Sequence, residues 1–258
     1  MAENDVARYP DLAGRIALVT GGSRGIGAAT CRALAANGAH IAVNGRDRAA
    51  IDTVVTQITD LGGTAIAAPG DVTDDDALAG LRTMIERTLG PVEILAAFAG
   101  GAGAPAPTTQ LGAQRWRATI ESDLTSVYLT VAEFLPAMIE HGGGSIITMS
   151  SAAGRQPSEA NIAYAAAKAG VAMLTRHLAK EAGRHRVRVN CLAPSAVLNE
   201  KMQQHMTPGQ LAGLATAFPL GRIGLPGDVA QAALFLASDA SSWITGVTLD
   251  LSGGRVIV

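Results

Sequence analysis

Three side chains in the second half of the sequence have types and spacing suited to moving a proton at a carbonyl or hydroxyl oxygen. Tyr164 and Lys168 lie four residues apart in a helix-forming stretch at 159–182, so they are predicted to share one helix face. Ser151 follows a predicted strand at 145–150, and the carboxyl ends of strands in open α/β sheets bind ligands.

Tyr164 is the candidate acid of this group. A phenol has an ordinary pKa of about 10, and a nearby ammonium such as that of Lys168 lowers the pKa by favouring the phenolate. Ser151 can hold the substrate oxygen by a hydrogen bond. The alternative is chance: three tyrosines and three lysines make nine pairs, so this separation and direction has a probability of about 9/258.

A glycine-rich loop near the amino terminus predicts a dinucleotide site. It lies between a short apolar run at 16–19, typical of a buried strand, and a helix-forming stretch at 28–36. Glycines let the backbone approach a pyrophosphate, and the first N–H groups of the helix face the phosphates. An ordinary tight turn is the alternative. The expected cofactor contacts in this loop are Thr20, Gly21, Ser23, Arg24, Gly25, Ile26 and Gly27.

The same loop matches the G-x-S-x-G nucleophile elbow of α/β-hydrolases, with Ser23 as the nucleophile. His141 and the three glycines after it also resemble the oxyanion-hole glycines of those enzymes. In hydrolases, however, the oxyanion loop precedes the elbow, whereas here the His-Gly run comes far after Ser23. The order of the motifs therefore argues against a hydrolase.

The end of the next predicted strand, at 41–43, bears on the choice between NAD and NADP. An acidic residue there suits the ribose 2′-OH of NAD, and an Arg suits the 2′-phosphate of NADP. This chain has Arg46 there, Arg24 in the glycine loop, and no acid at position 44 or 45. Two guanidinium groups on one phosphate favour NADP(H) over NAD(H). The alternative is that both arginines are solvated and that Asp47 turns inward.

Strand-like and helix-like segments alternate along the whole chain. This pattern predicts one Rossmann-type, doubly wound α/β domain over 1–258, with about seven parallel strands and helices on both faces. Residues 1–11 are expected to form a flexible N-terminus, and one long helix is predicted at 111–141, bent by Pro136. The stretch at 195–220 fits mobile helices over a substrate pocket and equally a permanently packed layer.

Composition excludes several classes of function. The formal net charge is -2, which gives no electrostatic reason to expect nucleic acid or a membrane as partner. No run approaches the ~18 apolar residues of a membrane span, and no signal-peptide core is present, so the cytoplasm is the expected location. Cys31 and Cys191 are expected to be buried free thiols, and no metal site is predicted.

From about Leu12 to Gly254, the chain resembles the short-chain dehydrogenase/reductase family. The motifs that carry the resemblance are Thr20-Gly21-x-x-x-Gly25-x-Gly27, Asp71-Val72, Ala99-Gly100, Ser151, Tyr164-x-x-x-Lys168, Pro194, and the segments 235–239 and 244–246. The resemblance implies Ser and Tyr at the substrate oxygen, Lys on the nicotinamide ribose and Asp71 near the adenine. The further cofactor contacts that it implies are Val72, Ala99, Gly100, Pro194, Val197 and Asn199.

Several positions depart from the family pattern. Residues 97–100 read Ala-Phe-Ala-Gly where the family usually has Asn-Asn-Ala-Gly. Asp123 stands where the family has an Asn that holds a water in the proton relay. A carboxylate can still hold the water, but it also stabilises the charged Lys168 and offsets its pull on the tyrosine proton. Ser195 and Asn199 replace a Gly and a Thr of the pattern.

The sequence therefore predicts an NADPH-dependent oxidoreductase that reduces a ketone, β-ketoacyl or related, to a secondary alcohol. Tyr164 is the predicted acid, Ser151 the oxygen anchor, Lys168 the ribose and pKa anchor, and Asp123 a relay residue. The resemblance points to 3-oxoacyl-carrier-protein reductases and related ketoreductases, a small-molecule substrate that is free or carrier-bound, and a homotetramer or homodimer. The altered Asn positions leave one alternative, an NADP-binding protein with weak or no redox activity.

Overall fold

Seven short segments of the chain pair in parallel to form one sheet. They are β1 (Ile16–Thr20), β2 (His40–Gly45), β3 (Thr64–Pro69), β4 (Ile94–Ala97), β5 (Gly144–Met149), β6 (Val187–Pro194) and β7 (Thr248–Leu251). Their order is β3-β2-β1-β4-β5-β6-β7, so the direction of winding reverses between β1 and β4. Doubly wound folds bind ligands at the carboxyl ends of the strands beside such a reversal. The predicted Rossmann-type domain is confirmed.

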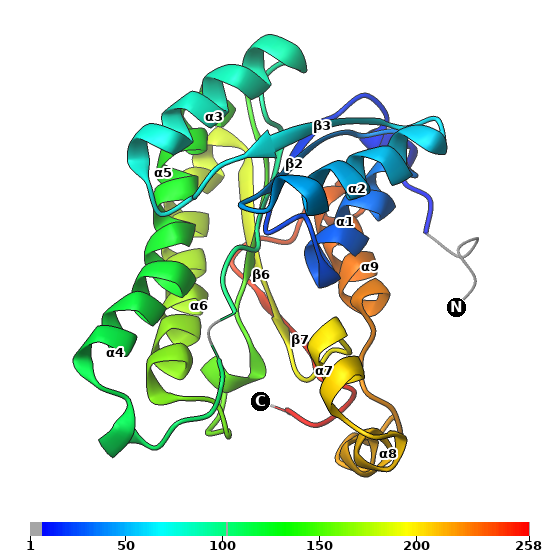
Figure 1. The fold of residues 1–258 in the computed structure, drawn as a ribbon. Coiled ribbons are helices and arrows are strands. Elements are labelled where there is room, and N and C mark those ends of the chain that lie inside the picture. The colour runs from blue at the N-terminus through cyan, green and yellow to red at the C-terminus, as the bar shows by residue number, and fades with distance from the viewer. Residues whose placement is uncertain (1–6, 102, 258) are drawn as a thin grey trace.

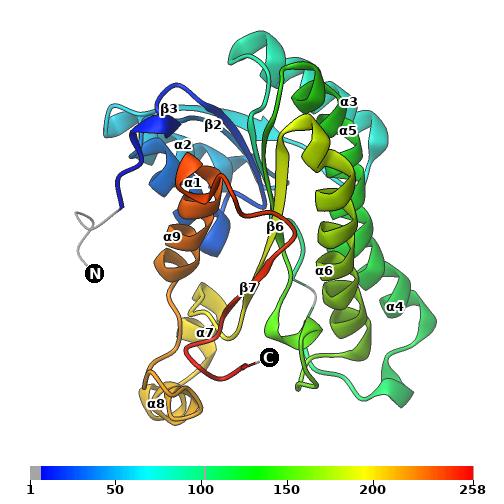
Figure 2. The same cartoon turned by 180° about the vertical axis from the view of Figure 1, so that it is seen from behind.

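This computed structural model describes residues 7–101 and 103–257, and helices cover both faces of its sheet (Figure 1, Figure 2). On one face lie α1 (Gly25–Ala35), α2 (Arg48–Asp60) and α9 (Pro226–Ala237). On the other lie α3 (Asp75–Thr88), α4 (Ala113–Ile120), α5 (Ser126–Glu140) and α6 (Ile162–Ala182). The short helices α7 (Glu200–His205) and α8 (Pro208–Ala215) lie near the carboxyl ends of β6 and β7. Within these ranges, no helix has the length and apolar character needed to cross a bilayer.

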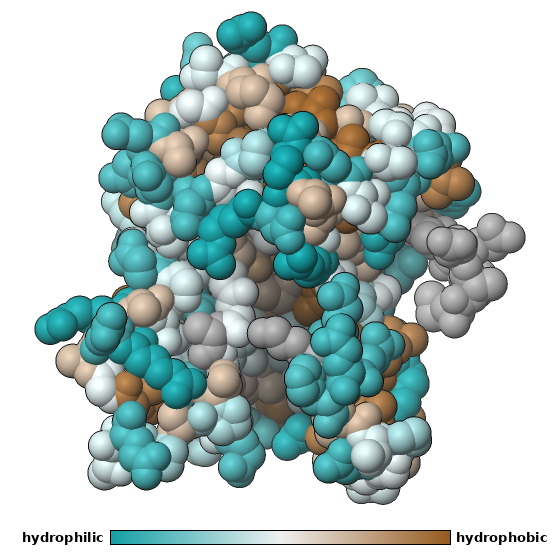
Figure 3. Space-filling model, in the orientation of Figure 1, coloured by the Kyte–Doolittle hydropathy of each residue, from teal (hydrophilic) through white to brown (hydrophobic). Residues whose placement is uncertain are grey.

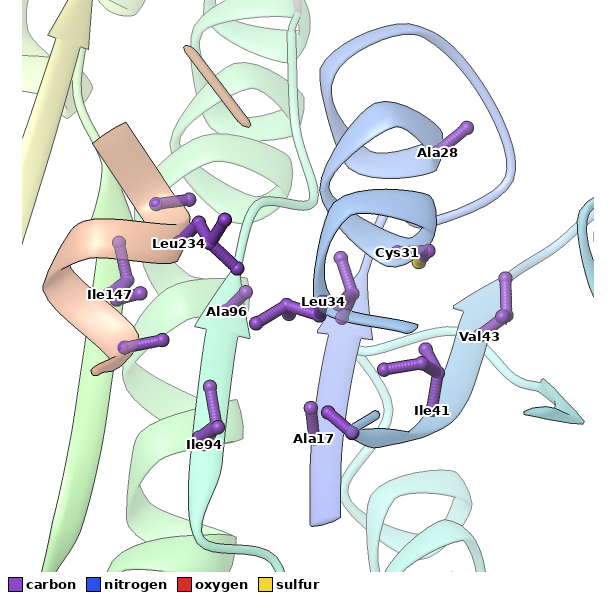
Figure 4. Packing of buried hydrophobic residues seen from close by; sticks show 14 of the residues in the cluster. Ala17, Ala28, Cys31, Leu34, Ile41, Val43, Ile94, Ala96, Ile147 and Leu234 are labelled. Carbon is purple, nitrogen blue, oxygen red and sulfur yellow. The ribbon is translucent and has the colours of Figure 1, made fainter. Parts of the chain in front are cut away.

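Alternate residues of the strands supply the two halves of the core, because successive side chains of a strand point to opposite faces. In β1, Val19 packs toward α1 and α9, and Leu18 packs toward α3 and α5. Figure 4 shows the first half, where Leu34 of α1 and Leu234 of α9 lie on the same side of the central strands, with Ala96 of β4 between them. Each fully buried Leu of this kind stabilises the fold by about 1.5–3 kcal/mol.

The long helix predicted at 111–141 is irregular in the middle. A π-helical turn, Glu121–Thr125, joins α4 to α5, and Asp123 within it is buried. Pro136 lies inside α5 without ending it. The apolar pattern did not reveal the turn, because the apolar residues from 116 to 138 keep the regular spacing of three and four residues. The most unusual backbone of this helix is therefore at Asp123.

Two further segments were singled out in the sequence, the N-terminal residues 1–11 and the stretch at 195–220. Residues 1–6 of the expected flexible N-terminus lie outside the described residues. From residue 7 onward the chain is hydrogen bonded to the body of the domain: Ala7 N donates to Gln231 Oε1, and Tyr9 N donates to Asn37 Oδ1. In the stretch at 195–220, α8 buries none of its side chains, whereas Phe218 just beyond it is buried. In that stretch, therefore, the helix α8 has no buried side chain, and the segment after it packs against the domain through Phe218.

Candidate active site and cofactor site

The glycine loop between β1 and α1 leaves no room for a side chain at Gly22 or Gly27. A Cβ at Gly27 would lie 2.1 Å from the carbonyl oxygen of Gly21, and Gly21 and Gly25 have positive φ angles of 63° and 51°. The loop therefore brings the first turn of α1 directly over the end of β1. This arrangement exposes backbone N–H groups at the start of a helix, which is the geometry that suits a pyrophosphate.

A cavity of about 560 Å³ lies at the carboxyl ends of β1 to β4, within the size range of cofactor pockets. Figure 3 shows this face of the molecule hollowed near its centre, with hydrophilic side chains around the hollow. The predicted cofactor residues that line the cavity are Gly21, Ser23, Arg24, Arg46, Asp71, Val72, Ala99 and Gly100. Its shape, position and donors fit a dinucleotide.

The other predicted cofactor residues lie elsewhere. Thr20 ends β1, and its Oγ1 accepts hydrogen bonds from the N–H groups of Phe98 and Ala99. Gly25, Ile26 and Gly27 form the first turn of α1. Pro194 ends β6, Asn199 caps α7 through a bond from Met202 N, and Val197 lines a second cavity of about 460 Å³ beside β7.

Both arginines at the rim of the cofactor cavity are paired with carboxylates. Arg24 Nη2 is bonded to Asp47 Oδ2, and Arg46 Nη1 lies 3.7 Å from Asp71 Oδ2. Hydrogen bonds from Thr73, and less strongly the charge of Arg46, lower the pKa of Asp71. The four side chains together carry no net charge. The sequence predicted the two cations, and the structure adds the two acids that compete for them.

The four predicted catalytic side chains form one cluster at the carboxyl ends of β4 and β5. Lys168 Nζ lies 3.2 Å from Asp123 Oδ1, donates to Met149 O at 3.0 Å and lies 5.5 Å from the centroid of the Tyr164 ring. The side chain of Ser151 lies near that of Tyr164 and lowers the pKa of its phenol. Gly101 N and Ser122 Oγ both donate to Asp123, and both residues line the cofactor cavity. The cluster and the cavity are therefore adjacent.

The pKa of Tyr164 shifts in the direction opposite to the expected one. Burial raises this pKa and the negative charge of Asp123 raises it further, whereas the Ser151 side chain lowers it. Burial lowers the pKa of Lys168, and Asp123 counteracts that effect. Lys168 was predicted to lower the tyrosine pKa. In the structure, burial is the largest cause acting on this pKa, and it raises it.

Comparison with known proteins identifies the family. The sequence model of short chain dehydrogenases matches residues 15–210 of this chain.

The chain belongs to the short-chain dehydrogenase/reductase family.

Individual members of the family are similar to this chain over nearly their full length. The cis-4-hydroxycyclohexanecarboxylate dehydrogenase of Sinomonas cyclohexanicum is 38% identical, over 95% of this chain and 97% of the relative. The 3-oxoacyl-[acyl-carrier-protein] reductase FabG of Chlamydia pneumoniae is 35% identical, over 94% and 97%. A structure of 7 alpha-hydroxysteroid dehydrogenase complexed with NADH and 7-oxo glycochenodeoxycholic acid is 34% identical, with a TM-score of 0.90 over 96% of each chain. This short-chain dehydrogenase/reductase is thus an NAD(P)-dependent oxidoreductase.

Two site residues of this short-chain dehydrogenase/reductase were missed by sequence reasoning. Asn161 caps α6, because its Oδ1 accepts from Tyr164 N, and its Nδ2 donates to Ala104 O. Gly103 lies against the tyrosine ring, where an added Cβ would be 3.1 Å from ring carbons. An Asn three residues before the tyrosine is a recognisable helix-capping signal. Nothing local to Gly103 indicates its distant contact.

Proposed function

We propose that this short-chain dehydrogenase/reductase reduces a ketone to a secondary alcohol with NADPH, and that Tyr164 is the general acid. The convergence of Tyr164, Ser151 and Lys168 beside the cofactor cavity carries this proposal. A phenol is protonated at neutral pH, which is the form that an acid requires, and burial and the charge of Asp123 raise the pKa of Tyr164 further. The phenolate that alcohol oxidation needs as a base is correspondingly scarce near pH 7.

Each residue of the cluster has a separate role in the proposed reaction. Ser151 holds the carbonyl oxygen by a hydrogen bond, and Tyr164 donates its phenolic proton to that oxygen. Lys168 binds the ribose of the cofactor, and its ammonium stabilises the phenolate that remains. The nicotinamide, when bound, supplies the hydride to the carbonyl carbon. One proton and one hydride thus convert the ketone into the alcohol.

NADP(H) is the cofactor that we infer, on the strength of Arg24 and Arg46 at the rim of the cavity. Both guanidinium groups can pair with a 2′-phosphate once they leave Asp47 and Asp71. Tight binding therefore requires the two ion pairs to open. The 7 alpha-hydroxysteroid dehydrogenase structure holds NADH, which makes NADH the comparison to include in every assay.

The substrate that we propose is a small ketone, either a β-ketoacyl group, free or carrier-bound, or a ring ketone. The Chlamydia relative is named for a 3-oxoacyl group on a carrier protein. The Sinomonas relative is named for a hydroxyl on a cyclohexane ring, and the steroid dehydrogenase structure holds a 7-oxo steroid. Two of these three relatives are named for ring substrates, which favours a cyclic ketone as the second candidate.

We also propose a cytoplasmic homotetramer, with a homodimer as the smaller alternative. Exposed apolar side chains on the two long helices support this assembly, among them Tyr128 on α5 and Met173 on α6. Such side chains gain free energy when a second copy covers them.

The first test is Tyr164→Phe, assayed by NADPH absorbance against β-keto thioesters, diketones and cyclic ketones. We expect kcat/KM to fall by about 10²-fold or more, because the proton donor is lost. NADPH affinity, measured by fluorescence titration, should stay unchanged. Tyr128→Phe, on the surface of α5, is the matched control and should keep full activity.

Two outcomes would contradict the proposal in different ways. Near-native turnover by Tyr164→Phe would remove the tyrosine from the mechanism. Tight NADPH binding by the native protein with no turnover of any carbonyl would instead favour the alternative, a cofactor-binding protein without redox activity.

A further inference from the structure

We propose that Asp123 is a positioning residue that holds Tyr164 in its protonated form and so biases the site toward carbonyl reduction at neutral pH. The inference rests on the proposed role of Tyr164 as acid. It assigns to Asp123 an electrostatic task, distinct from that of a relay for protons.

The charge of Asp123 is buried. Its side chain is completely buried in the π-helical turn, and Lys168 beside it is nearly so. Gly101 N and Ser122 Oγ donate hydrogen bonds to the carboxylate oxygens of Asp123. Since water screens buried charges poorly, this carboxylate acts strongly on its neighbours.

The same charge acts on the ammonium of Lys168. Lys168 Nζ lies 5.5 Å from the centre of the tyrosine ring and, acting alone, would favour the phenolate. Asp123 Oδ1 lies 3.2 Å from the same nitrogen, so the lysine and the aspartate form a pair with little net charge. The tyrosine therefore faces a neutralised pair and keeps its proton. Alcohol oxidation needs the phenolate as a base, so that direction is disfavoured near pH 7.

Other ionisable groups near the cluster do not replace this effect. Burial raises the pKa of Cys191 on β6, so its thiol stays neutral. Arg155, just after Ser151, is bonded twice to Asp250 on β7, at 3.0 and 3.1 Å. Arg115 on α4 is exposed to solvent and donates to Ala104 O. Asp123 is thus the carboxylate that faces the Tyr164 and Lys168 pair directly.

The charge can be removed without changing the shape of the site. In Asp123→Asn, the amide oxygen can still accept from Gly101 N and Lys168 Nζ, and the amide nitrogen can donate to Ser122 Oγ. A Cβ at Gly100 would lie 2.5 Å from Asp123 Oδ1, so the pocket around the side chain is closely fitted. The asparagine fits that pocket because it has the same size.

The experiment is a spectrophotometric titration of tyrosine ionisation, with no cofactor and no substrate. The protein has three tyrosines, so the difference between each variant and its Tyr164→Phe counterpart isolates Tyr164. We expect Asp123→Asn to lower the titration midpoint of Tyr164. Glu121→Gln, which removes an exposed carboxylate from the same π-helical turn, should leave the midpoint unchanged.

The second readout is the pH profile of alcohol oxidation. With Asp123→Asn, the rate at pH 7 relative to its alkaline plateau should rise about tenfold, because a midpoint lower by about one pH unit raises the phenolate fraction at pH 7 about tenfold. The rate of ketone reduction at alkaline pH, relative to the rate of the same variant at pH 7, should fall more in Asp123→Asn than in the native protein. Circular dichroism checks that the variant folds, and Asp123→Ser, also uncharged, takes its place if it does not.

An unchanged or raised Tyr164 midpoint in the uncharged variants overturns the inference. The titration separates this failure from failure of the proposed function, because it requires no turnover. A native protein that reduces no carbonyl but shows the expected lowering of the midpoint would keep the electrostatic role of Asp123 and remove the reaction.

Discussion

At the scale of single residues, the site is built from cations that are each held by a carboxylate. Arg24 pairs with Asp47, Arg46 with Asp71, and Lys168 with Asp123. These groups differ in exposure: the Arg46 side chain is 81% exposed, whereas that of Lys168 is 3% exposed. An exposed pair opens at little cost when a ligand offers a better anion, and a buried pair does not. Arg24 and Arg46 can therefore leave their carboxylates for a ligand phosphate, whereas Lys168 and Asp123 stay paired.

Cofactor choice is the prediction that belongs to this scale. Arg46→Asp removes a guanidinium and adds a carboxylate beside Asp71, which repels a 2′-phosphate and can accept from a ribose 2′-OH. We expect the ratio of kcat/KM for NADPH over NADH to fall at least about tenfold, because a charge-assisted bond is lost. Arg48→Asp, which breaks an exposed pair with Asp52 on α2, is the control. An unchanged ratio in Arg46→Asp would exclude Arg46 as the phosphate ligand.

The sequence could identify Tyr164, Lys168 and Asp123 as groups that act on one another, but not how deeply they are buried. Tyr164 and Lys168 were found together because a helix fixes their spacing. Asp123 and Lys168 are far apart in the sequence, and only the packing of the π-helical turn against α6 makes them an ion pair. The predicted direction of the tyrosine pKa took no account of burial, which is the largest cause that raises this pKa in the structure.

At the scale of elements, the turn from β1 into α1 sets how closely a ligand can approach the sheet. The strands and this glycine loop were predictable, because their apolar runs and glycines are local signals. The π-helical turn was not, because the apolar residues on either side of it keep the spacing of a regular helix. Within the glycine loop, Gly27 lies so close to the backbone of Gly21 that there is no room for a Cβ atom at this position.

Gly27→Ala tests this junction. The added methyl would lie 2.1 Å from Gly21 O, so the loop must shift, and we expect a loss of about 1–3 kcal/mol in unfolding free energy. Cofactor affinity should fall as well, since the first turn of α1 moves. Gly80→Ala is the matched control: it lies in α3 with nothing near its added Cβ and should gain about 0.5–1 kcal/mol. Chemical denaturation measures the unfolding free energy of both variants. Equal changes in unfolding free energy would contradict the close contact at Gly27 as the cause.

At the scale of the whole molecule, the two faces of the sheet differ in what their helices leave exposed. Tyr128 on α5 is 57% exposed and Met173 on α6 is 60% exposed, although both are large and apolar. The inner sides of the same helices pack on the sheet and contribute Phe134 and Val171 to the core. Because α6 also carries Tyr164 and Lys168, an assembly that covers its outer side would restrain the catalytic helix as well.

Met173→Glu tests whether that outer side is an interface between copies of the chain. If it is, each assembly must bury the new carboxylate without a partner, and we expect light scattering to show a smaller species, a dimer or monomer, with the dissociation constant raised at least about tenfold. Leu61→Glu, exposed beyond the end of α2 on the other face, should leave the mass unchanged. A native-sized assembly in Met173→Glu would place the interface elsewhere, and a monomeric native protein would remove the tetramer altogether.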